Sequence, residues 1–117
     1  MDFINDPQAI ERKSMELIKE EVGDLNCSLQ EEKIITRVIH ATADTDFADL
    51  VVVSDSAIES GLTALKTGAN IVTDVNMLRS GISKQKTKEL GNQINCFISD
   101  DSIAKQAKEV GITRSMM

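Results

Sequence analysis

The chain of 117 residues has one histidine, two cysteines and one proline, and these low counts exclude several kinds of site. Cys27 and Cys96 lie far apart and outside any C-x-x-C spacing, so neither a zinc site nor a disulfide framework is indicated. With a single histidine, only carboxylates remain as metal ligands. Asp44 and Asp46 could hold a hard cation, but acidic side chains at helix ends and turns usually do not. We therefore expect no metal.

Several targeting and nucleotide-binding patterns are also missing. The chain has no apolar run of about 18 residues and no cationic segment followed by an apolar one near residue 1. We expect a protein that is neither secreted nor membrane-spanning, with reduced thiols in the cytoplasm. The glycine-rich dinucleotide turn, the Walker A sequence and the G-x-S-x-G elbow of one hydrolase class are all absent.

Acidic residues outnumber basic ones by 19 to 13, which gives a net charge of -6. Such a field repels a phosphate-rich partner unless a local basic patch overcomes it. The only lysine cluster is Lys84, Lys86 and Lys88, and no aromatic residues are interleaved to stack on bases. This pattern is typical of a solvated helix face, and we expect no nucleic-acid partner.

Two helices are predicted at the start of the chain. Asp6 and Pro7 form an N-cap followed by proline at the first helical position, and the apolar stripe runs to a stop at Gly23. A second helix is predicted after Ser28, because Ser28 and Glu31 have the capping-box spacing. The β-branched residues that follow could also form a strand. The cap favours the helix.

His40 is the only side chain whose unperturbed pKa, about 6.5, allows proton transfer near neutrality without a special environment. On the predicted helix, Thr36, Arg37 and His40 are neighbours at the border of the apolar stripe, with Asp44 one turn further on. We expect His40 to be half-buried, with Asp44 as a candidate partner. A lone histidine on such a face is more often a structural hydrogen-bonding group than a catalyst.

The rest of the chain alternates short apolar runs with helical patterns. Such an order implies a parallel sheet with helical crossovers. The predicted strands are 50–53, 71–73 and 96–98, and the predicted helices are 56–66, 76–80, 84–90 and 102–110. We predict an α/β fold with three layers and a mostly parallel, Rossmann-like sheet, preceded by the two helices.

Each predicted strand ends in a hydroxyl residue followed by an aspartate. The pairs are Ser54-Asp55, Thr73-Asp74 and Ser99-Asp100. They could cap the helices that follow, since free N–H groups there need acceptors. They could also contact a ligand, because ligands of open α/β sheets bind outside the carboxyl ends of strands. Both interpretations remain open, and both can hold at once.

Four segments resemble the precorrin-8X methylmutase family, also called cobalt-precorrin-8 methylmutase. They are Asp6-Pro7-Gln8-Ala9-Ile10-Glu11-Arg12-Lys13-Ser14-Met15, Arg37-Val38-Ile39-His40-Ala41-Thr42-Ala43-Asp44, Gly68-Ala69-Asn70-Ile71-Val72-Thr73-Asp74-Val75-Asn76-Met77 with Gly81-Ile82, and Thr113-Arg114-Ser115. They occur in the family's order and spacing from about residue 6 onward. The histidine segment combined with the T-D-x-N-M run is quite specific.

The resemblance implies an isomerase of cobalamin biosynthesis, and thus of porphyrin metabolism, that moves a methyl group from carbon eleven to carbon twelve of a tetrapyrrole. It implies no added redox cofactor. By the same resemblance, His40 matches the catalytic histidine, which protonates or hydrogen-bonds the macrocycle. Ser14 and Arg37 match substrate-contacting positions, and Arg114 and Ser115, near the start of another helix, are further candidates. A guanidinium such as that of Arg37 suits the substrate's carboxylates.

The resemblance also sets an expectation about completeness. Family members continue well past the T-R-S motif, so residues 1–117 are expected to be a single methylmutase-like domain without the family's C-terminal part. An alternative function is a non-catalytic tetrapyrrole-binding or assembly domain. An incomplete sheet exposes an edge and an apolar face, so we expect a homodimer or a higher assembly.

Overall fold

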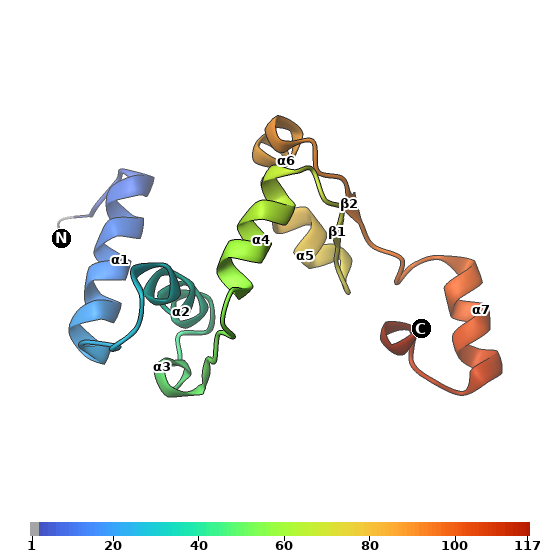
Figure 1. The fold of residues 1–117 in the computed structure, drawn as a ribbon, viewed down its shortest axis with the longest axis horizontal. Coiled ribbons are helices and arrows are strands. Elements are labelled where there is room, and N and C mark those ends of the chain that lie inside the picture. The colour runs from blue at the N-terminus through green and yellow to red at the C-terminus, as the bar shows by residue number, and fades with distance from the viewer. Residues whose placement is uncertain (1–2) are drawn as a thin grey trace. The chain divides into compact units, whose positions relative to one another are not determined.

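The computed structural model describes residues 3–117, which divide into one unit ending at Ile58 and a second spanning Glu59–Met117 (Figure 1). The first unit is helical, and the second contains helices and a small parallel sheet. The coarse prediction of an α/β chain with two N-terminal helices is confirmed.

The first helix, α1, spans Pro7–Val22 and is delimited as the sequence predicts. The Asp6 carboxylate accepts hydrogen bonds from the backbone N–H groups of Gln8, at 3.3 Å, and Ala9, at 3.0 Å. These N–H groups lack partners within the helix, so the cap satisfies them. At the other end, Gly23 has a φ of 70°, a conformation that costs glycine little.

The second helix, α2, spans Leu29–Thr42 and confirms the helical interpretation of the β-branched run. The full capping box is present: the Ser28 hydroxyl accepts from the Glu31 N–H at 3.3 Å, and the Glu31 carboxylate accepts from the Ser28 N–H at 2.8 Å. The inner face of α2 buries Ile35 and Ile39, which are the core of this unit together with the side chains that α1 packs against them. The helix ends at Ala43, which adopts the left-handed conformation.

The capping box leads to a prediction about pH. Hydrogen bonds from the Ser28 side chain and then from its backbone lower the pKa of Glu31. A lowered folded-state pKa means that Glu31 stabilises the fold above its unfolded pKa of about 4.3, and that this contribution is lost as the pH falls through the folded value. We expect Ser28→Ala to raise the Glu31 pKa in an NMR titration. As a control, Ser83→Ala removes the hydroxyl that accepts from the Lys86 N–H at the start of another helix, and it should leave the Glu31 pKa unchanged. Equal shifts of the Glu31 pKa in both variants would contradict the role of the capping box.

The short helix α3, Phe47–Leu50, takes up the first residue of a predicted strand, and Val51 is its C-cap. Residues 50–53 were expected to be buried on both faces of the sheet, and this prediction is wrong. The Leu50 and Val51 N–H groups bond to the carbonyls of Asp46 and Phe47 at 3.2 Å, which commits the beginning of the run to a helical turn. Beyond it the backbone is not paired as a strand within the described part of the chain, and Val52 is 88% exposed.

The second unit contains four helices and a two-stranded sheet. Its helices are α4 (Ala57–Lys66), α5 (Asn76–Gly81), α6 (Lys84–Leu90) and α7 (Asp101–Val110), and its strands are β1 (Ile71–Val72) and β2 (Ile94–Asn95). α4 begins at Ala57, within the first unit, and most of it belongs to the second. A 3-10 helix, η1, follows at Arg114–Met116. All four predicted helices are confirmed within two residues at each end.

The sheet is parallel, with Ile71 opposite Ile94 and Val72 opposite Asn95. The strand predicted over 71–73 is confirmed, whereas the one predicted over 96–98 lies two residues earlier. The ladder explains the offset: the Ile71 N–H donates to Gln93 O at 2.7 Å, and the chain turns after Asn95, where the Asp100 N–H donates to Phe97 O at 2.9 Å.

A buried asparagine fixes the approach to β1. Asn92 Nδ2 donates to the carbonyl oxygens of Leu65, at 3.0 Å, and Ala69, at 2.9 Å. The turn between them contains Gly68, with a φ of 80° and a position where a Cβ atom would lie 3.4 Å from Leu90 O. The Asn92 amide therefore holds the end of α4 beside the start of β1.

Candidate functional site

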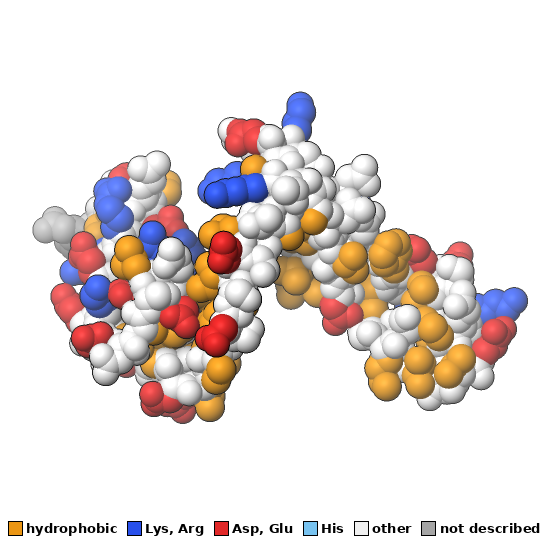
Figure 2. All heavy atoms as spheres, viewed as in Figure 1, with side chains coloured by type: hydrophobic (Ala, Val, Ile, Leu, Met, Phe, Trp, Pro, Cys, Tyr) orange, Lys and Arg blue, Asp and Glu red, His pale blue; other side chains and the backbone are white. Residues whose placement is uncertain are grey.

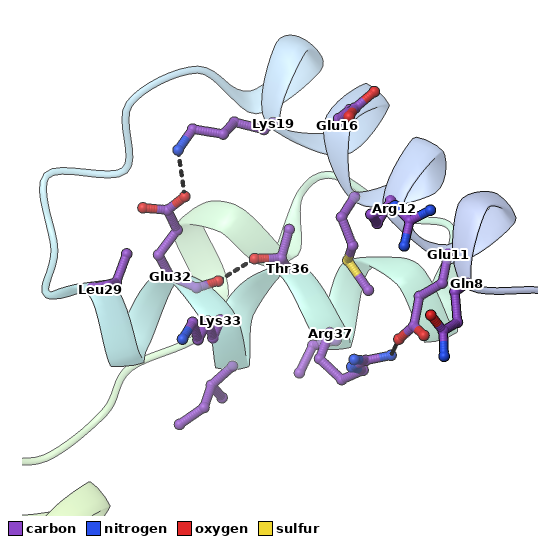
Figure 3. Close-up of a pocket in the computed structure, with 13 residues that line it drawn as sticks. Gln8, Glu11, Arg12, Glu16, Lys19, Leu29, Glu32, Lys33, Thr36 and Arg37 are labelled. Atoms are coloured by element: carbon purple, nitrogen blue, oxygen red, sulfur yellow. Dashed lines mark hydrogen bonds and ion pairs between the residues drawn. The ribbon is translucent and has the colours of Figure 1, made fainter.

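A groove of about 1070 Å³ lies between α1 and α2 (Figure 3). Both helices are amphipathic. Apolar side chains from both helices line it: Met15 from α1 and Leu29, Ile34 and Val38 from α2. The groove therefore combines apolar surface with open access to solvent.

Charged side chains of both signs surround this apolar lining. Figure 2 shows acidic and basic side chains interspersed over α1 and α2. Two ion pairs connect the helices: Arg37 Nη1 lies 2.8 Å from Glu11 Oε1, and Lys19 Nζ lies 2.8 Å from Glu32 Oε1. The hydrogen bond to Glu32 and the attraction of its charge raise the pKa of Lys19. The two pairs connect α1 and α2 across the groove.

Arg37 is the only predicted site residue that lines the groove within the described chain. Its side chain is 62% exposed and its guanidinium donates to the Glu11 carboxylate. A guanidinium offers five donors in a planar fork, so one hydrogen bond to Glu11 leaves further donors available. The geometry suits a carboxylate ligand.

Ser14 lies on α1 and is half-buried. Its Oγ donates to the carbonyl oxygen of Ile10, one turn earlier, at 3.0 Å. Ser14 is therefore a back-bonding helix serine in this conformation, and its hydroxyl must turn away from Ile10 before it can donate to a substrate.

His40 is exposed on α2, three residues after Arg37, and the expectation of a half-buried ring is wrong. The candidate partner Asp44 is not one helical turn beyond His40, because α2 ends at Thr42 and Ala43 is left-handed. The Asp44 carboxylate instead accepts from the Asp46 N–H at 3.0 Å. Within residues 3–117, the imidazole has no side-chain hydrogen bond or ion pair, so it is open to a ligand.

Arg114 and Ser115 belong to the second unit. Arg114 is the first residue of η1, which agrees with the expectation that it lies near the start of a helix. Its Nη1 donates to Ile98 O at 3.4 Å. Ser115 is exposed. These two residues are thus near the residues that follow β2, while His40, Ser14 and Arg37 belong to the first unit.

The hydroxyl–aspartate pairs behave differently from simple caps. Asp100 is the N-cap of α7 but its side chain makes no capping hydrogen bond. Thr73 is buried and donates to Asn95 O at 3.4 Å, which ties the end of β1 to β2. Ser99 accepts from Asn76 Nδ2 at 3.0 Å. The Thr73 hydroxyl thus links the two strand ends, and the Ser99 hydroxyl links the start of α5 to the segment before α7. The capping interpretation is not supported for Asp100.

Glu11 is the site residue that the sequence did not reveal. It contacts Arg37 across 26 positions of sequence, a distance that no local spacing rule covers. The only available signal was its place in the segment from Asp6 to Met15, which carries the family resemblance. The pair of Lys19 and Glu32, 13 positions apart, is likewise beyond any local spacing rule, and neither residue lies in a segment that carries the resemblance.

Comparisons with known proteins agree with this fold. A family model described as Precorrin-8X methylmutase matches residues 9–117. The chain is 40% identical over 107 residues to the cobalt-precorrin-8 methylmutase of Leptospira interrogans, with 92% of this chain and 49% of that protein covered. It is 38% identical over 121 residues to the Salmonella typhimurium protein of the same name, with 99% and 58% covered.

A solved structure matches as well. The precorrin-8X methylmutase of Thermus thermophilus superposes with a TM-score of 0.79 at 32% identity, over 92% of this chain and 51% of the other. The chain spans about half the length of the curated relatives it matches. Since the family match covers nearly all of the residues, the chain belongs to the precorrin-8X methylmutase family.

Proposed function

We propose that this chain carries out, or forms part of an enzyme that carries out, the methyl shift from carbon eleven to carbon twelve of precorrin-8X or its cobalt form. The observation that supports this most is the unbroken family match over residues 9–117. It includes α2 with His40 and the groove beside it. The reaction is an isomerisation in cobalamin biosynthesis, with no change in the number of atoms.

In this proposal His40 donates a proton, or a hydrogen bond, to the macrocycle while its conjugation changes. The exposed imidazole supports the role, since a catalytic acid must reach its substrate within about 3 Å. Arg37 binds a substrate carboxylate and so orients the ring relative to His40, three residues further along α2. Ser14, Arg114 and Ser115 are proposed as further substrate contacts.

We also propose the finer features of the assembly. Residues 1–117 form one methylmutase-like α/β domain with a three-layer, Rossmann-like arrangement, supported by the superposition at a TM-score of 0.79 on a single chain. A cytoplasmic homodimer or higher assembly is proposed, because exposed apolar side chains such as Leu50 and Val52 favour burial against a partner. No helix in the described part of the chain is long and apolar enough to cross a membrane.

The test is to mix the purified protein with precorrin-8X and to follow the absorption spectrum. We expect the spectrum of the rearranged product to appear, because moving the methyl group alters the conjugated system. A spectrum that stays that of unreacted precorrin-8X, with protein in excess, would contradict the proposal that this chain carries out the shift by itself.

A non-catalytic tetrapyrrole-binding domain is the second candidate. It is favoured by the position of His40, the proposed acid, which is not among the residues that line the groove. In the same assay this candidate predicts a shifted absorption band on binding, without any later conversion.

A further inference from the structure

Arg37 already holds a carboxylate in this structure, and that carboxylate comes from the protein itself. Glu11 Oε1 accepts from Arg37 Nη1 at 2.8 Å, although the two residues lie on different helices. Both side chains are more than half exposed, at 62% for Arg37 and 51% for Glu11. In the close-up, the Glu11 carboxylate points toward the Arg37 guanidinium at one end of the groove (Figure 3).

The charges around the groove favour an anionic ligand, although the net charge of the whole chain does not. The net charge of the chain is -6, yet the groove is lined by four cationic and three anionic side chains. Of the cations, Lys33 has no ion-pair partner within residues 3–117, and Arg12 lies 3.6 Å from Asp6 Oδ2 in an exposed pair. A ligand with several carboxylates can therefore meet Arg37 and further cations along one groove.

The groove also offers apolar surface next to these charges. Met15 and Val38 are partly buried beside it, and Ile34 remains 39% exposed. A planar macrocycle with carboxylates at its edge has this same combination of apolar body and charged rim. Chemical complementarity thus extends beyond the single ion pair.

We propose that Glu11 is a displaceable substitute for substrate: a peripheral carboxylate of the tetrapyrrole replaces the Glu11 carboxylate on Arg37, and Glu11 thereby sets the affinity of the groove for that ligand. The inference rests on the proposed function for its ligand class. An exposed ion pair contributes little to stability, so displacing Glu11 costs little, and the exchange trades one carboxylate for another at the same donors. Glu11 is a specificity-determining residue and takes no part in the methyl shift.

The test measures binding of uroporphyrin, a tetrapyrrole carboxylate that is not the isomerase substrate. The chain contains no tryptophan or tyrosine, so the porphyrin's own absorption and fluorescence report binding. Wild type is compared with Glu11→Gln and with Glu16→Gln. Glu16 is a matched control, since it lines the same groove on the same helix but pairs with Lys13 at 3.5 Å instead of Arg37. Circular dichroism confirms that each variant is folded.

Glu11→Gln should lower the Kd by about three- to fivefold, the range expected when a weak exposed pair no longer competes. Glu16→Gln removes the same charge without releasing Arg37. It should lower the Kd by less than twofold, because it removes only the long-range repulsion between one carboxylate and the anionic porphyrin. In an Arg37→Ala background the two glutamate substitutions should have equal effects. This pattern supports exchange at Arg37.

Three results would overturn the inference. Weaker binding by Glu11→Gln would mean that Glu11 positions Arg37 instead of competing for it. Equal effects of the two substitutions in the wild-type background would mean that only net charge matters, and no binding of uroporphyrin by any variant would mean that the groove is not a tetrapyrrole site. If the uroporphyrin affinities change as predicted but precorrin-8X is not converted, the proposed isomerase is refuted and this inference stands. If precorrin-8X is converted but the affinities do not change as predicted, this inference alone is refuted.

Discussion

His40→Ala is expected to lower the rate of precorrin-8X rearrangement by about 10²–10⁴-fold, the range typical for removal of a general acid or base. The physical reason is that His40 is the only histidine and its imidazole is open to the substrate. The measurement is single-turnover absorbance with enzyme in excess, which reports the chemical step and not product release.

Two further variants show whether His40 transfers a proton and whether the loss of rate is specific to His40. His40→Gln keeps a hydrogen-bond donor but cannot transfer a proton at neutral pH, so a rate near wild type would assign His40 to hydrogen bonding, while a rate near that of His40→Ala would assign it to proton transfer. Gln30→Ala is the matched control, because Gln30 is also exposed on α2 and does not line the groove. Unchanged turnover in His40→Ala would remove His40 from the mechanism.

Ile39→Ala is expected to cause the largest loss of stability, about 2–5 kcal/mol, in the free energy of unfolding. Ile39 is 2% exposed and is the largest fully buried side chain among the described residues. In the first unit the only other buried apolar side chain among the described residues is Ile35, so Ile39 accounts for much of the apolar surface that this unit buries. Urea denaturation followed by circular dichroism measures the change.

Ile34→Ala provides the control for Ile39→Ala. Both residues are isoleucines on α2, so helix propensity and the number of deleted atoms are the same, but Ile34 is 39% exposed. We expect Ile34→Ala to cost about 1 kcal/mol or less. Similar losses in the two variants would contradict the assignment of Ile39 to the core.

The helices could be predicted because their signals are local. Asp6 and Ser28 satisfy N–H groups within three residues of themselves, and glycine at position 23 adopts a backbone conformation that other residues avoid. The capping box also decided between helix and strand for the β-branched run of α2. Such interactions involve only neighbouring residues, so the sequence contains all the information needed.

The strands were harder to predict, because a strand exists only with a partner. Residues 50–53 have strong β propensity, yet the turn that begins at Asp46 uses their first N–H groups. The limits of β2 depend on which of its residues face Ile71 and Val72, and this register cannot be read from residues 94–98 alone.

In the candidate site, too, the features that depend on neighbouring residues could be predicted, and those that depend on tertiary packing could not. Arg37 and His40 could be placed on one helix from their spacing, and the structure keeps them there. The absence of Asp44 from the helix depends on the left-handed turn at Ala43, where no glycine signals the stop. The contact of Glu11 with Arg37 depends on how two helices pack, which requires the tertiary structure.

The most direct test of the proposed function follows the migrating methyl group itself. Precorrin-8X labelled with carbon-13 in the methyl group at carbon eleven is incubated with the protein and observed by NMR. The account predicts that the labelled signal moves to the chemical shift of a methyl group on carbon twelve, and that this happens far more slowly with His40→Ala. A label that stays on carbon eleven in the presence of folded wild-type protein would contradict it.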